Sequence, residues 1–368
     1  MKLIILRNNL LTALAASEKA INQNTNLPIL KNVFLGTNSG KVVLISTDLE
    51  LGVTNYLSGK IIEEGEITIP FGIFNNIIRN LTTDRVQLES KNNNLTIKSD
   101  NYEALVNVQS TNDFPTIPKI QDPEKNIIFK ATAFKEIVSK VITATQYSEI
   151  RPEISGLCLR YSEGVLKFVA TDSFRLAERV VRKEEYKTNF EDFELIIPFK
   201  AIQEVLKIIG GEGEVIIQFD PNQILFKTEN QEIISRLVNG NFPDYQTIVP
   251  KESKTEILIN KAELVNAVKL TSVFASRAND LVLKTGENSK FLEIYAGDSQ
   301  VGENRSLLPA KIKGDNFSVI FNWRYLLDGL KIFESGELVL TLTAPDRPMM
   351  VKGLNSENLF YLVMPIRV

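Results

Sequence analysis

The sequence predicts an α+β fold written in three tandem copies, each with two helices packed on antiparallel sheets. Three observations lead to this prediction. A phrase that reads as a strand followed by an amphipathic helix recurs at residues 69–81, 197–209 and 321–333. A second strand-and-helix phrase precedes each of these, at residues 3–21, 127–144 and 257–274. The rest of each copy alternates between apolar and polar residues and is divided by Asn, Gly, Asp and Pro turns, which is typical of short antiparallel strands.

The period of the repeat is too long for a solenoid. Solenoid repeats run to roughly 20–45 residues, whereas each copy here spans about 123 residues and can hold its own core. Each copy is expected to contain about eight strands. We therefore predict three domains, at residues 1–124, 125–250 and 251–368, with joints at the phrases "DFPTIP" and "NFPDYQTIVP" that end the first two copies.

The opening helix of each copy carries apolar residues at matching positions, which are Leu10, Ala13 and Leu14, then Phe134, Ile137 and Val138, then Leu264, Ala267 and Val268. A strand and a turn follow, centred on Asp48, Asp172 and Asp298. Because these aspartates occupy equivalent turns in separate domains, we interpret them as acceptors for backbone N–H groups. A catalytic role would require all three carboxylates in one site, whereas equivalent turns of separate domains would hold them far apart.

The second helix of each copy is predicted to bury one side and hold a cation on the other. Its apolar residues follow the i, i+3, i+4, i+7 pattern, namely Phe74, Ile77, Ile78 and Leu81, then Ile202, Val205, Leu206 and Ile209, then Leu326, Leu330 and Phe333, where Gly329 is the weak member. A base stands five residues after the first apolar position each time, at Arg79, Lys207 and Lys331. At about 100° per residue, this offset points away from the apolar stripe. The recurrence favours a shared binding function over an ordinary solvated face.

The composition excludes several classes of catalyst. The 368 residues include no histidine and one cysteine, so the usual general base, the Ser-His and Cys-His dyads and the commonest zinc ligand are missing. No phosphate-binding G-x-x-x-x-G-K-[ST] loop occurs, and "GGEGE" at 210–214 lacks the lysine. We therefore expect a protein that is not an enzyme and that needs no metal or cofactor. Cys158, in an alternating apolar run, is interpreted as a small core residue.

Charge and hydropathy limit the possible binding partners and the cellular location. The net charge of −3 is mildly acidic, so contact with a nucleic acid would require bases gathered on one surface. No apolar run has the length of a membrane span, and no signal peptide is evident, which together with the single cysteine favours the cytoplasm. Two rival functions stay open: a phosphohydrolase that uses carboxylates, and a scaffold that docks protein partners without DNA.

Five phrases point to a family. They are "NLPIL" (26–30), "STDLELGV" (46–53), "ATDSFRLAE" (170–178), "FPDY" (242–245) and "YLVMPIRV" (361–368). With the triplicated unit, they make the whole chain resemble the bacterial DNA polymerase III beta subunit, the sliding clamp. The resemblance implies a head-to-tail homodimer in which six DNA-clamp domains close into a ring around duplex DNA, with helices lining the hole. It also implies a role without catalysis, because the ring tethers the replicative polymerase to its template after an ATP-dependent clamp loader has placed it there.

The resemblance also implies three sets of functional residues. The bases that would face duplex DNA, without sequence preference, are Arg79, Lys207, Lys331, Lys200, Arg324, Lys140 and Lys269. A groove would take a short motif with apolar anchors and a Gln from the polymerase alpha subunit, the clamp loader and other proteins with a clamp-binding motif. Its residues would be Ile154, Thr171, Ser173, Phe174, Arg175, Leu176, Pro243, Thr247, Ile248, Pro348, Leu362, Val363, Met364, Pro365, Ile366 and Arg367.

The third set is the ring interface, where an edge strand containing Ala104 and Val106 would meet the region of Val273 and Phe274 in a second copy. The groove departs from the family pattern in two places. Phe174 stands where many members carry a histidine, and Thr247 stands where some carry a basic residue. Both changes make the rim of the predicted groove more apolar.

Overall fold

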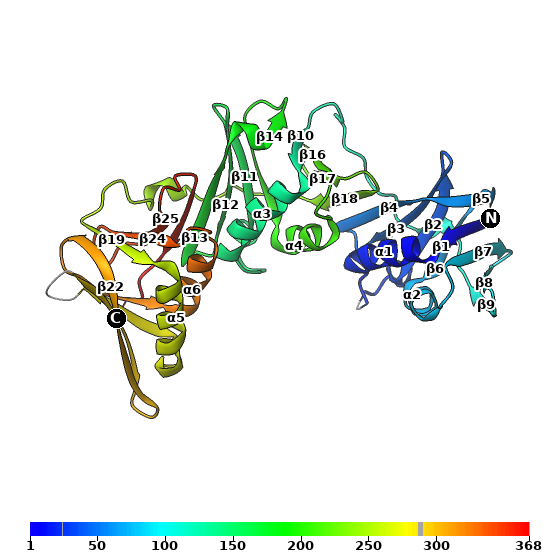
Figure 1. Ribbon diagram of the computed structural model, residues 1–368. Coiled ribbons are helices and arrows are strands. Elements are labelled where there is room, and N and C mark those ends of the chain that lie inside the picture. The colour runs from blue at the N-terminus through cyan, green and yellow to red at the C-terminus, as the bar shows by residue number, and fades with distance from the viewer. Residues whose placement is uncertain (24, 286–289, 368) are drawn as a thin grey trace. The chain divides into compact units, whose positions relative to one another are not determined.

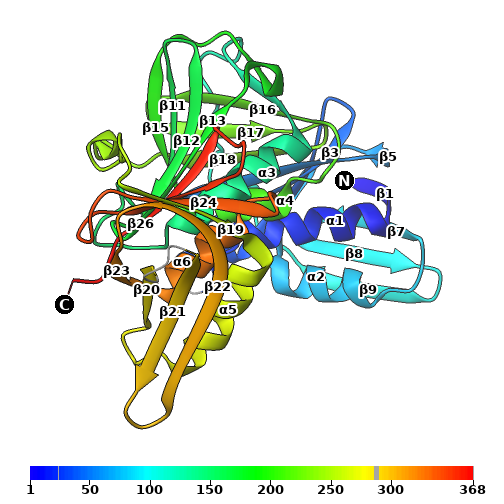
Figure 2. The same cartoon turned by 60° about the vertical axis from the view of Figure 1, so that its left-hand side comes forward.

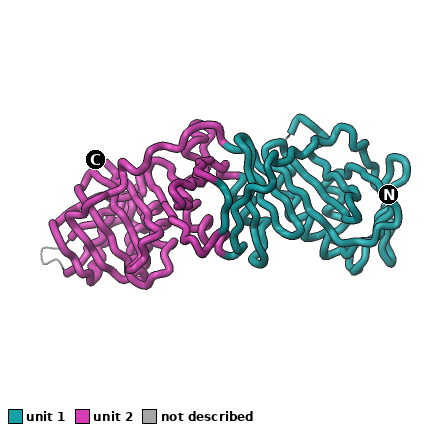
Figure 3. Tube along the Cα trace, turned by 90° about the horizontal axis from the view of Figure 1, so that it is seen from above, with its two compact units in different colours: residues 1–132, 187–190, 201–237 teal, residues 133–186, 191–200, 238–368 magenta. Residues whose placement is uncertain are grey.

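The computed structural model describes residues 1–23, 25–285 and 290–367. The chain divides into two compact units, coloured separately in Figure 3. Unit 1 comprises residues 1–132, 187–190 and 201–237, and unit 2 comprises residues 133–186, 191–200 and 238–368. Val368, which ends both the third predicted domain and the phrase at 361–368, lies outside the described residues.

Unit 1 contains two antiparallel sheets. The smaller sheet has the order β5-β1-β7-β8-β9, with bounds Gly59–Glu63, Lys2–Leu6, Arg85–Lys91, Asn94–Ser99 and Tyr102–Asn107. The larger sheet has the order β14-β10-β16-β17-β18-β4-β3-β2-β6, with bounds Tyr186–Thr188, Ile127–Lys130, Glu214–Asp220, Gln223–Lys227, Gln231–Arg236, Leu51–Leu57, Lys41–Thr47, Asn32–Asn38 and Glu66–Pro70. Strand β9 therefore lies at an edge of the smaller sheet, as the family resemblance implied.

Two helices close the core of the first repeat, α1 (Arg7–Ser17) and α2 (Phe71–Asn80). Pro70 ends β6 and lacks a backbone N–H, which suits the position just before a helix. Phe74 and Ile78 on α2 are fully buried in one cluster with Leu10 and Leu14 of α1. Figure 1 shows α1 lying along β3 and β4. The predicted apolar stripes therefore form the contact between helices and sheets.

Unit 2 is built on one twelve-stranded antiparallel sheet. Its order is β15-β11-β12-β13-β26-β25-β24-β19-β22-β21-β20-β23, with bounds Phe193–Pro198, Gly156–Ser162, Val165–Thr171, Arg175–Val181, Leu359–Val363, Met349–Gly353, Glu337–Leu342, Thr255–Asn260, Gly302–Gly314, Phe291–Asp298, Asp280–Thr285 and Ser318–Asn322. Strand β26 pairs with β13 from Arg175↔Val363 to Arg179↔Leu359. The second and third repeats are thus joined by main-chain hydrogen bonds.

The helices of the third repeat are α5 (Lys261–Thr271) and α6 (Trp323–Lys331). Each has an asparagine N-cap: the Oδ1 atom of Asn260 accepts from the N–H of Glu263, and that of Asn322 accepts from the N–H of Arg324. Figure 2 shows α5 beside the long hairpin of β21 and β22. The helices of the middle repeat, α3 (Ala131–Val141) and α4 (Phe199–Ile208), each begin in one unit and continue into the other.

The described residues contain two α-helices per repeat, as predicted, with nine strands in each of the first two repeats and eight in the third. The two compact units do not coincide with three equal domains. Strand β18 of the middle repeat pairs with β4 of the first, and β13 pairs with β26 of the third. The middle repeat therefore gives strands to both units, and the boundaries at 1–124, 125–250 and 251–368 stay a prediction.

Candidate functional site

A tight turn at the end of β12 begins the region of unit 2 that holds the predicted groove residues. The Oδ1 atom of Asp172 accepts hydrogen bonds from the backbone N–H groups of Phe174, at 3.0 Å, and of Arg175, at 3.1 Å. Ser173 adopts a φ of 75° to allow this. Asp48 makes the same turn in the first repeat, where it accepts from the N–H groups of residues 50 and 51. Asp48 and Asp172 thus each close a turn, which is the role we predicted for them.

Arg175 is committed to ion pairs beneath this turn. Only 7% of the residue is exposed, and its guanidinium contacts Oδ2 of Asp172 at 2.9 Å and Oδ2 of Asp328 on α6 at 2.7 Å. The guanidinium also lies 4.5 Å from the ring centroid of Tyr325. Burial opposes its charge, but Tyr361 and the two carboxylates outweigh this and raise the pKa of Arg175. Arg175 therefore ties the turn to α6.

The rim of this region carries an exposed aromatic pair. Phe174 is 56% exposed and stacks on Tyr325, with ring centroids 6.1 Å apart and planes 19° apart. The backbone N–H of Met364 donates to the carbonyl of Phe174 at 2.8 Å. The residues after β26 are thereby held against the turn, and the N–H of Ile366 donates to the carbonyl of Ile320 at 2.8 Å.

The connector between β18 and β19 holds three of the predicted groove residues, Pro243, Thr247 and Ile248. It contains a short 3₁₀ turn at Tyr245–Thr247. Phe242 and Tyr245 are buried against the sheet in a cluster that includes Cys158, Val169, Leu176, Ile196, Met350 and Leu362. Burial raises the pKa of the Cys158 thiol, in keeping with the core role we predicted for it. The intervening connector residues stay at the surface.

The predicted groove residues fall into three classes of exposure. Those at the surface are Ser173, Phe174, Pro243, Thr247, Ile248 and Arg367. Those that are half-buried are Ile154, Met364, Pro365 and Ile366. Those that are buried are Thr171, Arg175, Leu176, Pro348, Leu362 and Val363. All lie in unit 2. Solvent does not reach the buried members in this conformation, so a partner would contact the exposed and half-buried members first.

The three recurring bases are all exposed and all stand in the last turn of their helices. A cation there also interacts favourably with the negative end of the helix dipole. Arg79 contacts Glu18 at 3.1 Å, and Lys207 contacts Glu204 at 2.7 Å. Exposed pairs of this kind contribute little and exchange readily. Lys331 has no ion pair with any of the described residues.

The other four bases predicted to face DNA differ in how firmly contacts within the chain hold them. Lys269 is exposed in the last turn of α5. Lys200 lies 3.8 Å from the ring centroid of Tyr147, and the Nε atom of Arg324 donates to Asn279 at 3.0 Å. Lys140 is held more tightly, because its Nζ atom contacts carboxylates of both Glu136 and Glu334 at 2.7 Å. Burial opposes the charge of Lys140, but these two hydrogen bonds raise its pKa. Lys140 is thus the least free of the seven bases.

Two of the predicted interface residues, Ala104 and Val106, lie on the edge strand β9, but the sequence reading missed Leu105, the most exposed apolar residue of that strand. Val106 is 6% exposed and Ala104 is half-buried, because they stand opposite the core residues Leu95 and Ile97 of β8. Leu105 between them is 67% exposed. It lines a hollow of about 390 Å³ together with Pro70, Ile73, Val106, Asn107, Val108 and Gln109. The alternation of strand residues was the signal that identifies Leu105.

Unit 2 carries a second exposed apolar surface at the end of α5. Val273 is 68% exposed and Phe274 is half-buried. Leu270 on α5 and Leu307 on β22, which the sequence reading also missed, are 56% and 54% exposed. Residues 302–309 of β22 pair with β21, and residues 310–314 pair with β19. Among the described residues, no strand pairs with the other edge of 302–309.

The described part of the chain has no group of three or more Asp, Glu, Cys or His side chains placed to hold a metal ion. None of its helices is long and apolar enough to span a membrane.

Comparison with known proteins decides the family. Models of the N-terminal, central and C-terminal domains of the DNA polymerase III beta subunit match residues 1–118, 129–244 and 246–367. The chain belongs to the DNA polymerase III beta subunit family. Its fold is accordingly three tandem copies of the clamp domain, each combining helices with antiparallel sheets.

Relatives in this family match the chain from end to end. The beta sliding clamp of Bacillus subtilis is 27% identical over 379 residues, and that of Synechococcus elongatus is 28% identical over 376 residues, with both chains of each pair fully covered. The crystal structure of the Bacillus subtilis clamp has a TM-score of 0.94 at 26% identity, covering 100% of this chain and 99% of that one. The Pseudomonas aeruginosa beta subunit gives 0.94 at 25%, with both chains fully covered. The chain therefore has the function of this family, a sliding clamp of DNA polymerase III.

Proposed function

We propose that two copies of this chain close head to tail into a six-domain ring around duplex DNA and confer processivity on the replicative DNA polymerase. The ring works in the cytoplasm and catalyses nothing itself. It holds the polymerase alpha subunit and other proteins with a clamp-binding motif at its groove, and a clamp loader opens it. The observation that carries this proposal is the match of all three beta-subunit domain models along the chain.

The basic helix ends suit a ring that slides. A sliding protein must not read bases, so its contacts should be sparse and directed at phosphates, which look alike at every position. Arg79, Lys207 and Lys331 offer long, exposed side chains at equivalent helix ends in three repeats. Enclosure, and not affinity, keeps such a protein on its track. A chain with a net charge of −3 can therefore serve, provided that the lumen itself is electropositive.

The test is retention on DNA after loading. The wild-type protein should stay on closed circular DNA and leave the same DNA once it is linearised, because only an encircling protein slides off free ends. Replacing Arg79, Lys207 and Lys331 by Glu should lower the amount of protein loaded on the circle about tenfold and leave dimerisation intact. The matched control carries the same three charge reversals on exposed strand lysines, one from each repeat, at Lys60, Lys227 and Lys313.

Equal retention on circular and linear DNA would reject the ring, and would favour a scaffold that docks partners without DNA. If the lumen variant and the control were loaded equally poorly, the assignment of these three bases would be wrong, while the ring itself would stand.

The ring interface is proposed between the β9 edge of one copy and the free edge of β22 in another. Each edge offers unpaired backbone groups next to exposed apolar side chains, a combination that aggregates unless it is covered. Leu105→Asp should convert a species of about twice 41.4 kDa into a monomer in native mass measurements. Ile62→Asp is the matched control, since Ile62 is 50% exposed on β5, at the opposite edge of the same sheet. A dimeric Leu105→Asp variant would remove β9 from the interface.

A further inference from the structure

The connector after β18 is pinned to the sheet by apolar packing. The Phe242 and Tyr245 side chains are 5% and 3% exposed, and their rings meet edge to face with centroids 6.1 Å apart. They pack on Leu176 of β13 and Leu362 of β26, two of the buried residues beneath the predicted groove. Apolar contacts of this kind hold the connector down, but they are non-directional and do not define its register.

A directional contact is buried in the same place. Glu178 on β13 is only 4% exposed. It accepts a 2.5 Å hydrogen bond from the hydroxyl of Tyr245 and a 3.3 Å bond from Nε2 of Gln246, and Nζ of Lys167 lies 3.4 Å away. An O–H···O⁻ bond of this length is charge-assisted. Burial and the Glu178 carboxylate raise the pKa of Tyr245, so the phenol keeps its proton and can donate at neutral pH.

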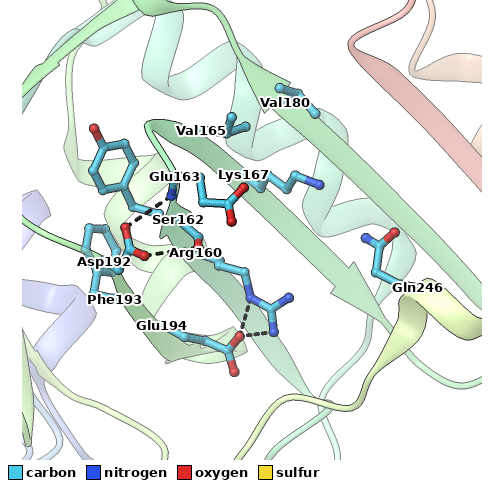
Figure 4. Close-up of a pocket in the computed structure, with 11 residues that line it drawn as sticks. Arg160, Ser162, Glu163, Val165, Lys167, Val180, Asp192, Phe193, Glu194 and Gln246 are labelled. Atoms are coloured by element: carbon cyan, nitrogen blue, oxygen red, sulfur yellow. Dashed lines mark hydrogen bonds and ion pairs between the residues drawn. The ribbon is translucent and has the colours of Figure 1, made fainter.

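An open hollow borders this network. It has a volume of about 750 Å³ and includes Arg160, Lys167, Val180, Glu194 and Gln246 in its lining. Figure 4 shows Lys167 extending from β12 on the side of the hollow where Gln246 lies, while Arg160 pairs with Glu194 across the strands. Lys167 therefore contacts Glu178 from the side of the hollow. The Tyr245 hydroxyl contacts it from the buried side of the connector.

Hydrogen bonds within the 3₁₀ turn fix the exposed residues Thr247 and Ile248 relative to Tyr245. The N–H of Ile248 donates to the carbonyl of Tyr245 at 3.1 Å, and the Thr247 hydroxyl donates to the carbonyl of Asp244 at 2.9 Å. Thr247 and Ile248 thus cannot shift unless the turn moves as a whole. Glu178, which accepts the hydrogen bond from Tyr245, lies on β13. This strand begins at Arg175, directly after the turn that contains Phe174. The hydrogen bonds to Glu178, of which the one from Tyr245 is the shorter, therefore link the connector to the strand that follows the turn.

We propose that the Tyr245–Glu178 hydrogen bond is a positioning element of the partner groove, holding the connector side at a fixed register against the β12–β13 turn side. This inference rests on the proposed function of the groove. Without the bond the connector would stay packed but would sample several registers, and each binding event would have to select one. Ordering a few side chains and a turn on binding should cost about fivefold in affinity.

The experiment measures fluorescence polarisation of a labelled synthetic peptide that carries a Gln and apolar anchors, titrated with the full chain. Tyr245→Phe removes the hydroxyl and keeps the ring, and should weaken binding about fivefold, chiefly through slower association, because only a fraction of the free chain would hold the binding register. Glu178→Leu removes the acceptor and should weaken binding at least as much, and adding Tyr245→Phe to it should cost nothing more, because the bond is already lost. Tyr56→Phe is the matched control: its hydroxyl donates to Glu232 at 3.0 Å in unit 1, and its loss should leave the affinity unchanged.

Hydrogen exchange separates positioning from general stability. Amides of residues 246–249 should exchange faster in Tyr245→Phe, while those of β4 should not. Wild-type affinity in Tyr245→Phe, or an equal loss in Tyr56→Phe, would overturn the inference. Failure of the wild-type chain to bind the peptide would reject the groove itself, so the two failures are distinguishable.

Discussion

Replacing Gly329 by alanine tests how α6 packs on the C-terminal strand. In an exposed helix interior, Gly→Ala stabilises by about 1 kcal/mol. Here a Cβ on Gly329 would stand 2.3 Å from both Cδ1 and Cε1 of the Tyr361 ring. That ring is fully buried, and its hydroxyl donates to the carbonyl of Tyr325 at 2.8 Å, so it has little room to move. Overpacking of this size costs about 3 kcal/mol. The clash should therefore win, with a net loss of about 2 kcal/mol.

The assay is urea unfolding followed by circular dichroism. A loss of about 2 kcal/mol should lower the midpoint by about 1 M. Gly72→Ala is the matched control, since Gly72 lies in the equivalent helix α2 and a Cβ added there would meet no atom within 4 Å. That change should raise the midpoint. Adding Tyr361→Leu to Gly329→Ala should recover part of the loss by making room. If Gly329→Ala stabilised the protein as Gly72→Ala is expected to, the packing argument would be refuted.

Three further outcomes are expected. The Cys158 thiol should react with a disulfide reagent only as fast as the protein unfolds, since the side chain is buried and its pKa raised by that burial; rapid stoichiometric labelling of the folded chain would contradict this. The pKa of Glu89 is lowered from 4.5 to about 2, first by its hydrogen bond with Lys2, so its contribution to stability is present above pH 4.5 and is lost as the pH falls toward 2. Lys2→Met should therefore shift acid unfolding to higher pH, and an unshifted curve would count against it. Met364→Ala combined with Pro365→Ala should weaken binding of the partner peptide, and unchanged affinity would count against the groove.

The helices were predictable because their signal is local. The residues Phe74, Ile202 and Leu326 recur at one phase of a 3.6-residue period, and all three are fully buried. Gly329 shows where this reading stops. It looked like a gap in the apolar stripe, but the structure shows that it makes room for a ring on a strand some thirty residues further along the chain. A contact between distant segments leaves no periodic trace in either of them.

The candidate site was predicted in part for the same reason. Phe174 and Thr247 could be placed at a rim from the family resemblance, and both are exposed. Which residues would lie beneath was not visible, since Leu176 and Leu362 differ from surface leucines only through the connector that covers them. Leu105 was missed although the alternation of β9 marks it, because the family resemblance pointed to its neighbours, which face the core.

The joints between repeats in this chain are made by pairing of strands, β4 with β18 and β13 with β26. Backbone donors and acceptors are identical for every residue except proline, so these seams do not depend on which side chains the strands carry. Substitutions can accumulate along them without loosening the connection. The crystal structure of the Bacillus subtilis clamp, with a TM-score of 0.94 at 26% identity, is in keeping with this.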